Sequence, residues 1–165
     1  MRRTVLAAVV AALTLAAPAQ VIESYQVRDA VTLRGPIETD SINGEGRKFE
    51  TKNLLGTAIG LNQDNYTTQA MEADTAGFIT LAKADGEHLI YVVSTQIRAD
   101  RFMKGKLKVT SPVRWEAYIN GASKSRKENA DDSLNVKAAQ DIALRLEPER
   151  NYEITLKLLA HKDDK

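Results

Sequence analysis

The residues best suited to binding a ligand alternate along one predicted strand. They share a parity, and side chains two residues apart lie on the same face of a strand: Arg114, Glu116, Tyr118 and Asn120. A tyrosine ring beside guanidinium, carboxylate and amide groups can stack on a sugar ring and hydrogen-bond to its hydroxyls. This face is the candidate ligand-binding site, and an ordinary polar outer face is the alternative.

The single tryptophan belongs to the other face of the same segment. Trp115 shares its parity with Val113, Ala117 and Ile119, which are all apolar. Apolar residues at alternate positions indicate the buried side of a half-buried strand. We therefore expect the indole in the core rather than stacked on a ligand.

Two pairs of carboxylates have the composition of a glycosidase site but not its defining geometry. Glu72 with Asp74, and Asp131 with Asp132, are close in sequence. Glycoside hydrolysis needs two carboxyl groups at a defined separation across a cleft, which closeness in sequence does not provide. We interpret these four residues as solubilising.

Metal binding has little support in the residue types. The two histidines, His88 and His161, are predicted to be exposed, one in a strand arm and one in a charged tail. We expect no cofactor and no metal ion. The alternative is a structural calcium ion held by loop oxygens, with candidate ligands Asn62, Asp64, Asn65, Glu72 and Asp74.

Motifs for nucleophilic and nucleotide chemistry are absent from the sequence. A nucleophile elbow needs Gly-x-Ser-x-Gly, and this pattern does not occur. The glycines at 44 and 46, and those at 56 and 60, do not continue into a phosphate-binding fingerprint. We interpret them as turn residues and expect that this chain is not an enzyme.

The N-terminus has the three-part layout of an export signal. Two arginines precede an apolar stretch at 5–17, which ends in the small-residue pattern Ala17-Pro18-Ala19. This is the layout of a cleavable signal peptide, and the stretch is shorter than the ~20 residues of a membrane-spanning helix. We predict a signal-peptide helix within 1–19, cleavage before Gln20, and a secreted or periplasmic protein without a membrane anchor.

Composition favours one domain without disulfides and without a marked charge. About 146 residues follow the predicted cleavage point, enough for a single core. Removing the two leader arginines from the 23 basic residues leaves one fewer than the 22 acidic residues, so nothing indicates nucleic acid or an anionic membrane as a partner. The chain has no cysteine. We predict a domain at 20–160 and a charged tail or linker at 161–165.

Apolar residues recur with period two after residue 77, which indicates strands. Asp85-Gly86 predicts a hairpin between the first two strands, and Asn120-Gly121 predicts a second hairpin turn. The stretch 89–93, apolar on both faces, predicts a central strand covered on two sides. The predicted strands are 78–82, 89–94, 106–110, 113–119, 142–146 and 152–158, with weaker ones at 23–27, 30–33 and 57–61.

One segment between these strands has mixed charges and few bulky apolar residues. It spans 122–135 and is predicted to be an exposed loop. A helix over 133–146 is an alternative, because three alanines there favour helix, although alternating Ile142, Leu144 and Leu146 favour a strand. Six to nine short strands separated by turns predict an all-β fold, a β-sandwich or jelly roll.

The order of these segments resembles the galactose-binding-like jelly roll. The runs that carry the resemblance are Ala76-Gly77-Phe78-Ile79-Thr80-Leu81, Tyr91-Val92-Val93-Ser94, Gly105-Lys106-Leu107-Lys108-Val109-Thr110-Ser111-Pro112, Trp115-Glu116-Ala117-Tyr118-Ile119-Asn120-Gly121 and Leu144-Arg145-Leu146-Glu147-Pro148-Glu149. Together with Gly35-Pro36-Ile37-Glu38-Thr39-Asp40-Ser41, the chain is similar to the leader domain of secreted prolyl-oligopeptidase-type peptidases of Bacteroidota. The resemblance covers most of the chain after residue 20. It implies that a β-propeller and an α/β-hydrolase domain would follow in the whole protein.

The residues and the resemblance lead to one expected function with two alternatives. We expect a non-catalytic extracytoplasmic accessory or docking module, whose partner is a neighbouring domain of a larger secreted protein, a glycan or a peptide. The first alternative is a carbohydrate-binding module that uses the face around Tyr118. The second is a small stand-alone hydrolase, for which no catalytic triad can be assembled from these residues.

Overall fold

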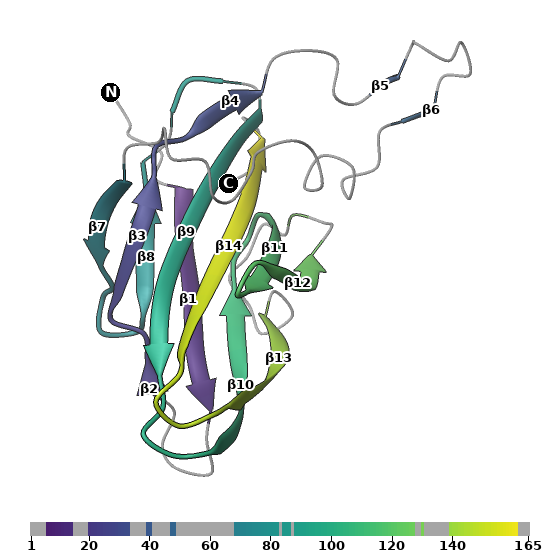
Figure 1. Ribbon diagram of the computed structural model, residues 1–165. Helices are drawn as coiled ribbons and strands as arrows, with labels where there is room; N and C mark the ends of the chain where they lie inside the picture. The colour runs from purple at the N-terminus through teal and green to yellow at the C-terminus, as the bar shows by residue number, and fades with distance from the viewer. Residues whose placement is uncertain are drawn as a thin grey trace.

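The computed structural model describes residues 6–14, 20–33, 39–40, 47–48, 68–82, 84–86, 88–127, 130 and 139–161. Every regular element in these residues is a β-strand, as the alternation of apolar residues predicts. No helix in the described part of the chain is long and apolar enough to cross a bilayer. The strands form two larger antiparallel sheets, which Figure 1 shows as two layers.

Sheet A is the smaller of the two. Its strand order is β13 (Ala139–Leu146), β10 (Met103–Thr110), β1 (Leu6–Thr14) and β2 (Gln20–Val21), and β8 (Phe78–Leu81) also pairs with β1. The β1 strand is antiparallel to β10, to β8 and to β2. It therefore lies inside the sheet and separates β8 from β10.

Sheet B is built around two long strands. Its order is β12 (Ala122–Lys127), β11 (Arg114–Ile119), β14 (Asn151–His161), β9 (His88–Arg98), β3 (Ser24–Arg28) and β7 (Thr68–Glu72), and β4 (Val31–Leu33) also pairs with β9. The short strands β5 (Thr39–Asp40) and β6 (Arg47–Lys48) pair only with each other. The predicted strands at 23–27 and 30–33 correspond to β3 and β4.

One hydrophobic core joins the two sheets. Alternate residues of β10, Leu107 and Val109, are fully buried, and they belong to the same cluster as Leu156 and Leu158 of β14. Trp115 lies in this cluster with 0% of its surface exposed. A core shared by two facing sheets is that of a β-sandwich, so the predicted all-β class and the buried indole are both confirmed.

The strand β9 is covered on both of its faces at one end. Its residues 89–93 are each exposed by 3% or less, whichever way their side chains point. The side chains of Leu89, Tyr91 and Val93 belong to the core shared by the sheets, whereas Ile90 and Val92 are buried outside it. The predicted central strand covered on two sides is therefore confirmed.

One predicted hairpin is wrong. The segments on either side of Asp85-Gly86 form β8 and β9, but β8 pairs with β1 in sheet A and β9 pairs with β14 in sheet B. The turn thus carries the chain from one layer of the sandwich to the other. Alternation predicts which side of a strand is buried, but it does not say which strand is its neighbour.

The second predicted hairpin is confirmed. The strand that follows its turn shows that the neighbouring prediction of a loop is wrong in part. Asn120 and Gly121 have φ angles of 50° and 77°, the positive values of a two-residue turn that matches the twist of antiparallel strands. After this turn, Ala122–Lys127 is paired along β11 as β12. The prediction of an exposed loop is therefore wrong for 122–127. Backbone pairing with β11 makes this segment a strand, although its polar composition did not indicate one.

Two further expectations differ from the structure. Residues 139–146 form β13 next to β10, so the helical alternative is wrong for that part of 133–146. The apolar segment Leu6–Thr14, expected as a signal-peptide helix, is the strand β1. Its neighbours β8 and β10 bind its backbone from both sides, and these long-range pairs outweigh the helix preference of its alanines.

Some predictions lie outside the described residues. These are the end of the export segment at 15–19, the strand at 57–61, three of the five candidate calcium ligands, the pair Asp131 and Asp132, residues 128–129 and 131–135 of the predicted loop, and residues 162–165. His161, which the predicted tail includes, is the last residue of β14. The ordered ladder therefore extends one residue into the predicted tail.

Candidate functional site

The predicted residues Arg114, Glu116 and Tyr118 alternate along β11, and Asn120 follows in the turn after the strand; the four are called here the Tyr118 face. It lies on the side of sheet B that points away from the shared core, because Trp115 and Ala117 of the same strand are fully buried in that core. Its members are not equally accessible. Arg114 and Tyr118 are partly exposed, Asn120 is exposed, and Glu116 is buried.

Glu116 lies between cationic groups on both neighbouring strands. It is 4% exposed, its Oε1 accepts a hydrogen bond from Ser123 Oγ at 2.5 Å, and the same oxygen lies 3.7 Å from Arg126 Nη2. On the other side, Lys157 of β14 is the direct cross-strand partner of Glu116 and is 3% exposed. A buried carboxylate needs such partners, since an unpaired buried charge is very costly.

The surroundings of Tyr118 change the proton affinities of this face. Burial raises the pKa of Tyr118 to about 12, and the hydrogen bond and charge of Glu116 act in the same direction. Burial also lowers the pKa of Lys157, while the Glu116 carboxylate opposes that change. Lys157 Nζ lies 5.9 Å from the centroid of the Tyr118 ring. The face is thus a packed polar cluster, and its role in binding a ligand stays a prediction.

Asn120 has a role in the fold that its parity did not indicate. Its Oδ1 accepts a hydrogen bond from the backbone N–H of Glu153 at 2.9 Å, and its own N–H donates to the Glu153 carbonyl at 2.9 Å. These two bonds tie the β11–β12 turn to the start of β14. Its amide oxygen is therefore engaged in holding the turn.

The two histidines meet at the end of sheet B. His88 and His161 are cross-strand partners in β9 and β14, with ring centroids 4.6 Å apart and an interplanar angle of 63°. His88 is only 6% exposed, so the expectation of two exposed histidines is wrong for this residue. In the described part of the chain, no group of three or more His, Cys, Asp or Glu side chains is arranged to hold a metal ion.

One proposed calcium ligand is used in a turn. The Oδ1 of Asp74 accepts hydrogen bonds from the N–H groups of Ala76 at 2.9 Å and Phe78 at 2.8 Å. These bonds shape the turn that leads into β8. Glu72 is exposed in β7, and the other three candidate ligands lie outside the described residues.

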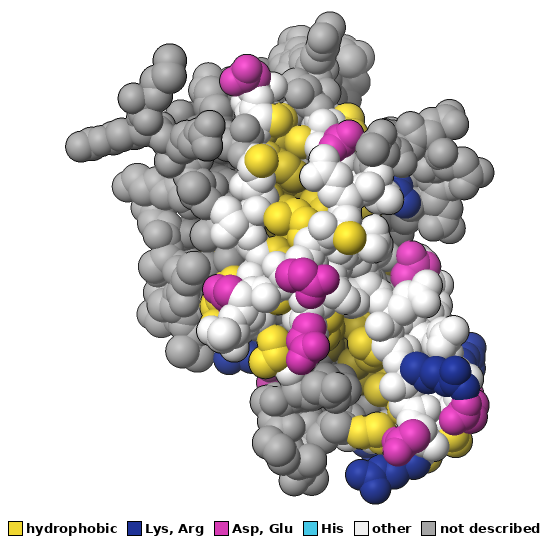
Figure 2. All heavy atoms as spheres, turned by 90° about the vertical axis from the view of Figure 1, so that its left-hand side faces the viewer, with side chains coloured by type: hydrophobic (Ala, Val, Ile, Leu, Met, Phe, Trp, Pro, Cys, Tyr) yellow, Lys and Arg dark blue, Asp and Glu magenta, His cyan; other side chains and the backbone are white. Residues whose placement is uncertain are grey.

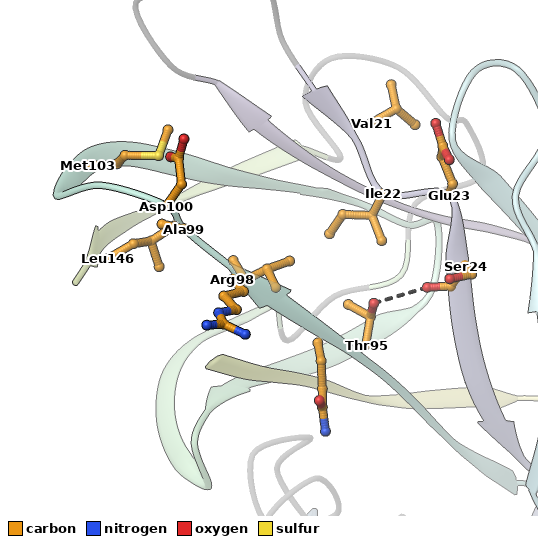
Figure 3. A pocket seen from close by; sticks show the side chains of 12 residues that line it. Val21, Ile22, Glu23, Ser24, Thr95, Arg98, Ala99, Asp100, Met103 and Leu146 are labelled. Atoms are coloured by element: carbon orange, nitrogen blue, oxygen red, sulfur yellow. Dashed lines mark hydrogen bonds between the residues drawn. The ribbon is translucent and has the colours of Figure 1, made fainter. Parts of the chain in front are cut away.

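A hollow at one end of the sandwich was not predicted. This end cleft has a volume of about 500 Å³ and is shown in Figure 3. Segments from both ends of the domain line it: Val21, Ile22, Glu23, Ser24, Thr95, Gln96, Ile97, Arg98, Ala99, Asp100, Met103 and Leu146. No single stretch of sequence contains more than six of these residues, which explains why spacing along the chain did not reveal the cleft.

The end cleft exists because β3 separates from β9. The two strands pair only at Gln26 with Ser94 and at Val27 with Val93. Beyond this point Thr95 Oγ1 donates to the Ser24 carbonyl at 2.9 Å, the dashed line in Figure 3. A side chain thus replaces the backbone ladder. From here to Arg98, β9 is paired with β14 but not with β3.

The base of the end cleft is held by the turn before β14. Ala99 forms a bridge with Pro148, and its carbonyl accepts a hydrogen bond from the Glu149 N–H at 2.9 Å. Glu149 has a φ of 60° and pairs with Arg98. The Tyr152 hydroxyl accepts a hydrogen bond from the Glu147 N–H at 2.9 Å. These contacts fix the corner at which β9 leaves sheet B.

Charged residues line the end cleft, and an exposed aromatic residue follows one of them in the sequence. Glu23, Arg98 and Asp100 are all exposed. Phe102 comes two residues after Asp100, and its side chain is 58% exposed. Among the described residues it is the large hydrophobic residue that is exposed to solvent. An exposed aromatic group surrounded by charged residues is a common composition of interaction sites.

Apolar side chains also extend along the edge of the sandwich. Ile22, Met71 and Ala73 are partly exposed and pack against the core. Figure 2 shows the side of the molecule where β3 and β7 lie, and hydrophobic side chains form a band there between polar margins that include acidic groups. The apolar surface near the end cleft is therefore not confined to Phe102.

In comparisons with protein families, with curated proteins and with solved structures, no family model, protein or structure matches this chain. The functional conclusion therefore depends on the residues and on the geometry described above.

Proposed function

We propose that this chain is a non-catalytic, extracytoplasmic β-sandwich module that docks onto a neighbouring domain of a larger secreted hydrolase. In this proposal residues 1–19 direct export, and the domain belongs with the galactose-binding-like jelly rolls found in front of prolyl-oligopeptidase-type peptidases. It takes no cofactor. Its contact with the neighbouring domain is made at the end cleft.

The observation that carries the proposal is the exposed ring of Phe102, which lies in the sequence between the cleft-lining residues Asp100 and Met103. At 58% exposure, most of this apolar side chain is in water, and covering it with a partner would be favourable. The charged rim of Glu23, Arg98 and Asp100 would give such a contact its orientation. The supporting turn at Ala99 and Glu149 keeps the site rigid, which lowers the entropic cost of binding.

Glycan binding at the same place is the second candidate. The observation that favours it is again Phe102, since an exposed ring next to carboxylates and a guanidinium can stack on a sugar and bind its hydroxyls. The Tyr118 face offers less for this function, because the Tyr118 ring already has Lys157 Nζ above it at 5.9 Å.

Reading the gene beyond Lys165 is the first test. The docking proposal expects an in-frame β-propeller and hydrolase domain. The neighbouring domain is then produced separately, and its affinity for this chain is measured by calorimetry. Phe102→Ala is expected to weaken binding by at least tenfold, as for an aromatic anchor at an interface. Lys124→Ala, an exposed site on β12, is the matched control and should leave the affinity unchanged.

Two results would contradict the docking proposal. A stop codon after Lys165 in an intact locus would mean that no neighbouring domain is encoded. An unchanged affinity of Phe102→Ala would mean that the end cleft is not part of the contact. A glycan array then separates the second candidate. Binding that is lost in Phe102→Ala and retained in Tyr118→Ala would support sugar recognition at the end cleft.

A further inference from the structure

The strand β1 holds sheet A together from within. Five of its residues pair with β10, from Val10 opposite Thr110 to Thr14 opposite Lys106. On its other side it pairs with β8, from Leu6 opposite Leu81 to Val10 opposite Phe78, with an irregularity between Ala7 and Val9. Sheet A has no direct pairing between β8 and β10. The same residues are the apolar stretch of the predicted export signal.

The sequence of β1 differs from that of its long neighbour β10. In β10, Lys104, Lys106 and Lys108 alternate with the other residues and are exposed or partly exposed. In β1 the register places Val9, Ala11 and Leu13 opposite inward-facing residues, but the positions between them, Val10 and Ala12, are apolar as well. A strand selected only for this sheet would alternate. An apolar composition on both faces is what an export signal requires.

We propose that removal of residues 1–19 opens a slot in sheet A, bordered by β8 along one half and by β10 along the other, that binds an extended segment of a partner protein with alternating apolar and acidic residues. The inference rests on the export step of the proposed function, but it concerns a different surface from the end cleft. The slot is the space that β1 fills, beside β8 at residues 6–10 and beside β10 at residues 10–14.

The geometry of the slot requires a replacement strand. The β8 strand pairs with residues 6–10 of β1 and the β10 strand with residues 10–14, so removing β1 exposes one edge of each strand along successive halves of the slot. Both strands then present unpaired N–H and C=O groups at this gap, and such open edges bind further strands. Below the gap lie Ile79, Leu107 and Val109, each exposed by 1% or less while β1 is present. The inner side of an incoming strand must therefore be apolar.

The charges next to the slot define the outer side of the partner strand. On the outer face of sheet A, β10 carries Lys104, Lys106 and Lys108. Opposite Lys104 in β13 lies another cation, Arg145, and Asp141 is 3.2 Å from Lys106 Nζ. This surface is thus mainly basic. The β1 residues opposite Lys108 and Lys106 are Ala12 and Thr14, which are uncharged, so a strand with acids at these positions fits better than β1 does.

The test uses the full chain with a specific protease site placed within residues 15–19. The folded protein is cleaved in vitro, which needs no export, and synthetic peptides of residues 6–14 are added. One peptide carries Ala12→Glu and Thr14→Glu, and its matched control carries Ala12→Lys and Thr14→Lys. A third carries Ala11→Pro, because proline in a central strand removes a ladder hydrogen bond. Native mass spectrometry and thermal unfolding report which peptide occupies the slot.

We expect the glutamate peptide to displace the native segment and to bind at least tenfold more tightly than the lysine peptide. The difference should shrink in high salt, because the lysines of β10 are largely exposed, and the proline peptide should not bind. If cleavage unfolds the protein, the glutamate peptide should restore folding. The variant Phe102→Ala should exchange peptides normally, since the end cleft takes no part, and this separates failure of the slot from failure of the proposed docking function.

Four outcomes would overturn the proposal. The first is release of residues 6–14 without loss of thermal stability or uptake of any peptide, which would mean that β8 and β10 close the gap. Equal affinity of the glutamate and lysine peptides would mean that the partner strand is not selected for acidic residues. Self-association of the cleaved protein through the slot would make a second copy the occupant. Failure of every peptide to refold an unfolded cleaved protein would also contradict it.

Discussion

At the scale of single residues, Trp115 has the most unusual environment. The indole is fully buried, and its Nε1 has no hydrogen-bond acceptor among the described residues. A buried donor without a partner costs about 1–3 kcal/mol, so the packing of the ring must outweigh this cost. Tyr91 offers the opposite case, because its hydroxyl donates to the Ala82 carbonyl at 2.9 Å.

This contrast predicts different costs for removing the two polar groups. Trp115→Phe loses contact area but also removes the unpaired N–H, so we expect a loss of about 1–2 kcal/mol, against about 3–5 kcal/mol for Trp115→Ala. Tyr91→Phe loses a satisfied hydrogen bond, at about 1 kcal/mol, with almost no change in packing. Urea unfolding followed by circular dichroism measures all three. A loss well above 2 kcal/mol in Trp115→Phe would show that the indole N–H has a partner.

The raised pKa of Tyr118 predicts a loss of stability at alkaline pH. In the unfolded chain tyrosine loses its proton near pH 10, whereas in the folded protein its pKa is about 12. Between these values the folded state binds more protons than the unfolded state, so the free energy of unfolding falls as the pH rises. Tyr118→Phe removes this contribution, and its stability should decline less over pH 10–12.

Lys157 changes the free energy of unfolding in the opposite direction as the pH rises. The test therefore compares the stability curves of two variants rather than one curve alone. Because its folded-state pKa is lowered, its contribution to stability increases as the pH rises from that lowered value towards the unfolded value near 10.5. Both Tyr118→Phe and the parent protein contain this lysine. Identical slopes for the two proteins above pH 10 would show that Tyr118 titrates normally.

At the scale of elements, the geometry of the β11–β12 turn predicts how much stability is lost when one methyl group is added to it. Gly121 has a φ of 77°, and a Cβ built on it meets nothing within 4 Å. Gly121→Ala should therefore cost only the backbone strain of a positive φ, about 1 kcal/mol. Thermal unfolding measures the change, and Ala122→Gly, at the next exposed position, is a control for the loss of a side chain. A loss much above 2 kcal/mol would indicate a steric clash and contradict the open geometry.

Strands could be predicted where the alternation of buried and exposed residues is visible within one short segment of the sequence. Leu107 and Val109, or Ile142 and Leu144, alternate with polar neighbours, and each of these segments is a strand with the predicted side buried. Pairing was harder to predict, because it is decided between segments distant in sequence. Ala122–Lys127 has a loop-like composition and becomes a strand through β11. Leu6–Thr14 reads as an export signal and becomes a strand through β8 and β10.

The candidate sites show the same limit. Arg114, Glu116 and Tyr118 were placed correctly on one side of β11, since this follows from parity, whereas Asn120 lies in the turn after the strand. Neither the burial of Glu116 nor the bonds of Asn120 to Glu153 follow from parity. The end cleft was missed because Ile22, Arg98 and Leu146 come together only in the folded chain. A signal existed in Phe102, an aromatic residue between two strands with charged neighbours.

At the scale of the whole molecule, the single core predicts that both sheets unfold together. Leu107 of sheet A and Trp115 of sheet B belong to one buried cluster. Leu107→Ala should cost about 2–5 kcal/mol and shift the unfolding transition seen by Trp115 fluorescence and by circular dichroism equally. Thr80→Ala, at an exposed site in β8, is the control. Separate transitions for the two signals would mean that the sheets fold independently.

The long ladder of sheet B also has a consequence for the order of events during synthesis. Residues 88–98 pair one by one with residues 151–161, from His88 with His161 to Arg98 with Asn151. The first of these two partners leaves the ribosome well before the second is translated, so for that interval the middle of the sheet has no closing strand. We expect nascent chains shorter than about 160 residues to be sensitive to protease, because the edge of residues 88–98 stays open until the last strand is made.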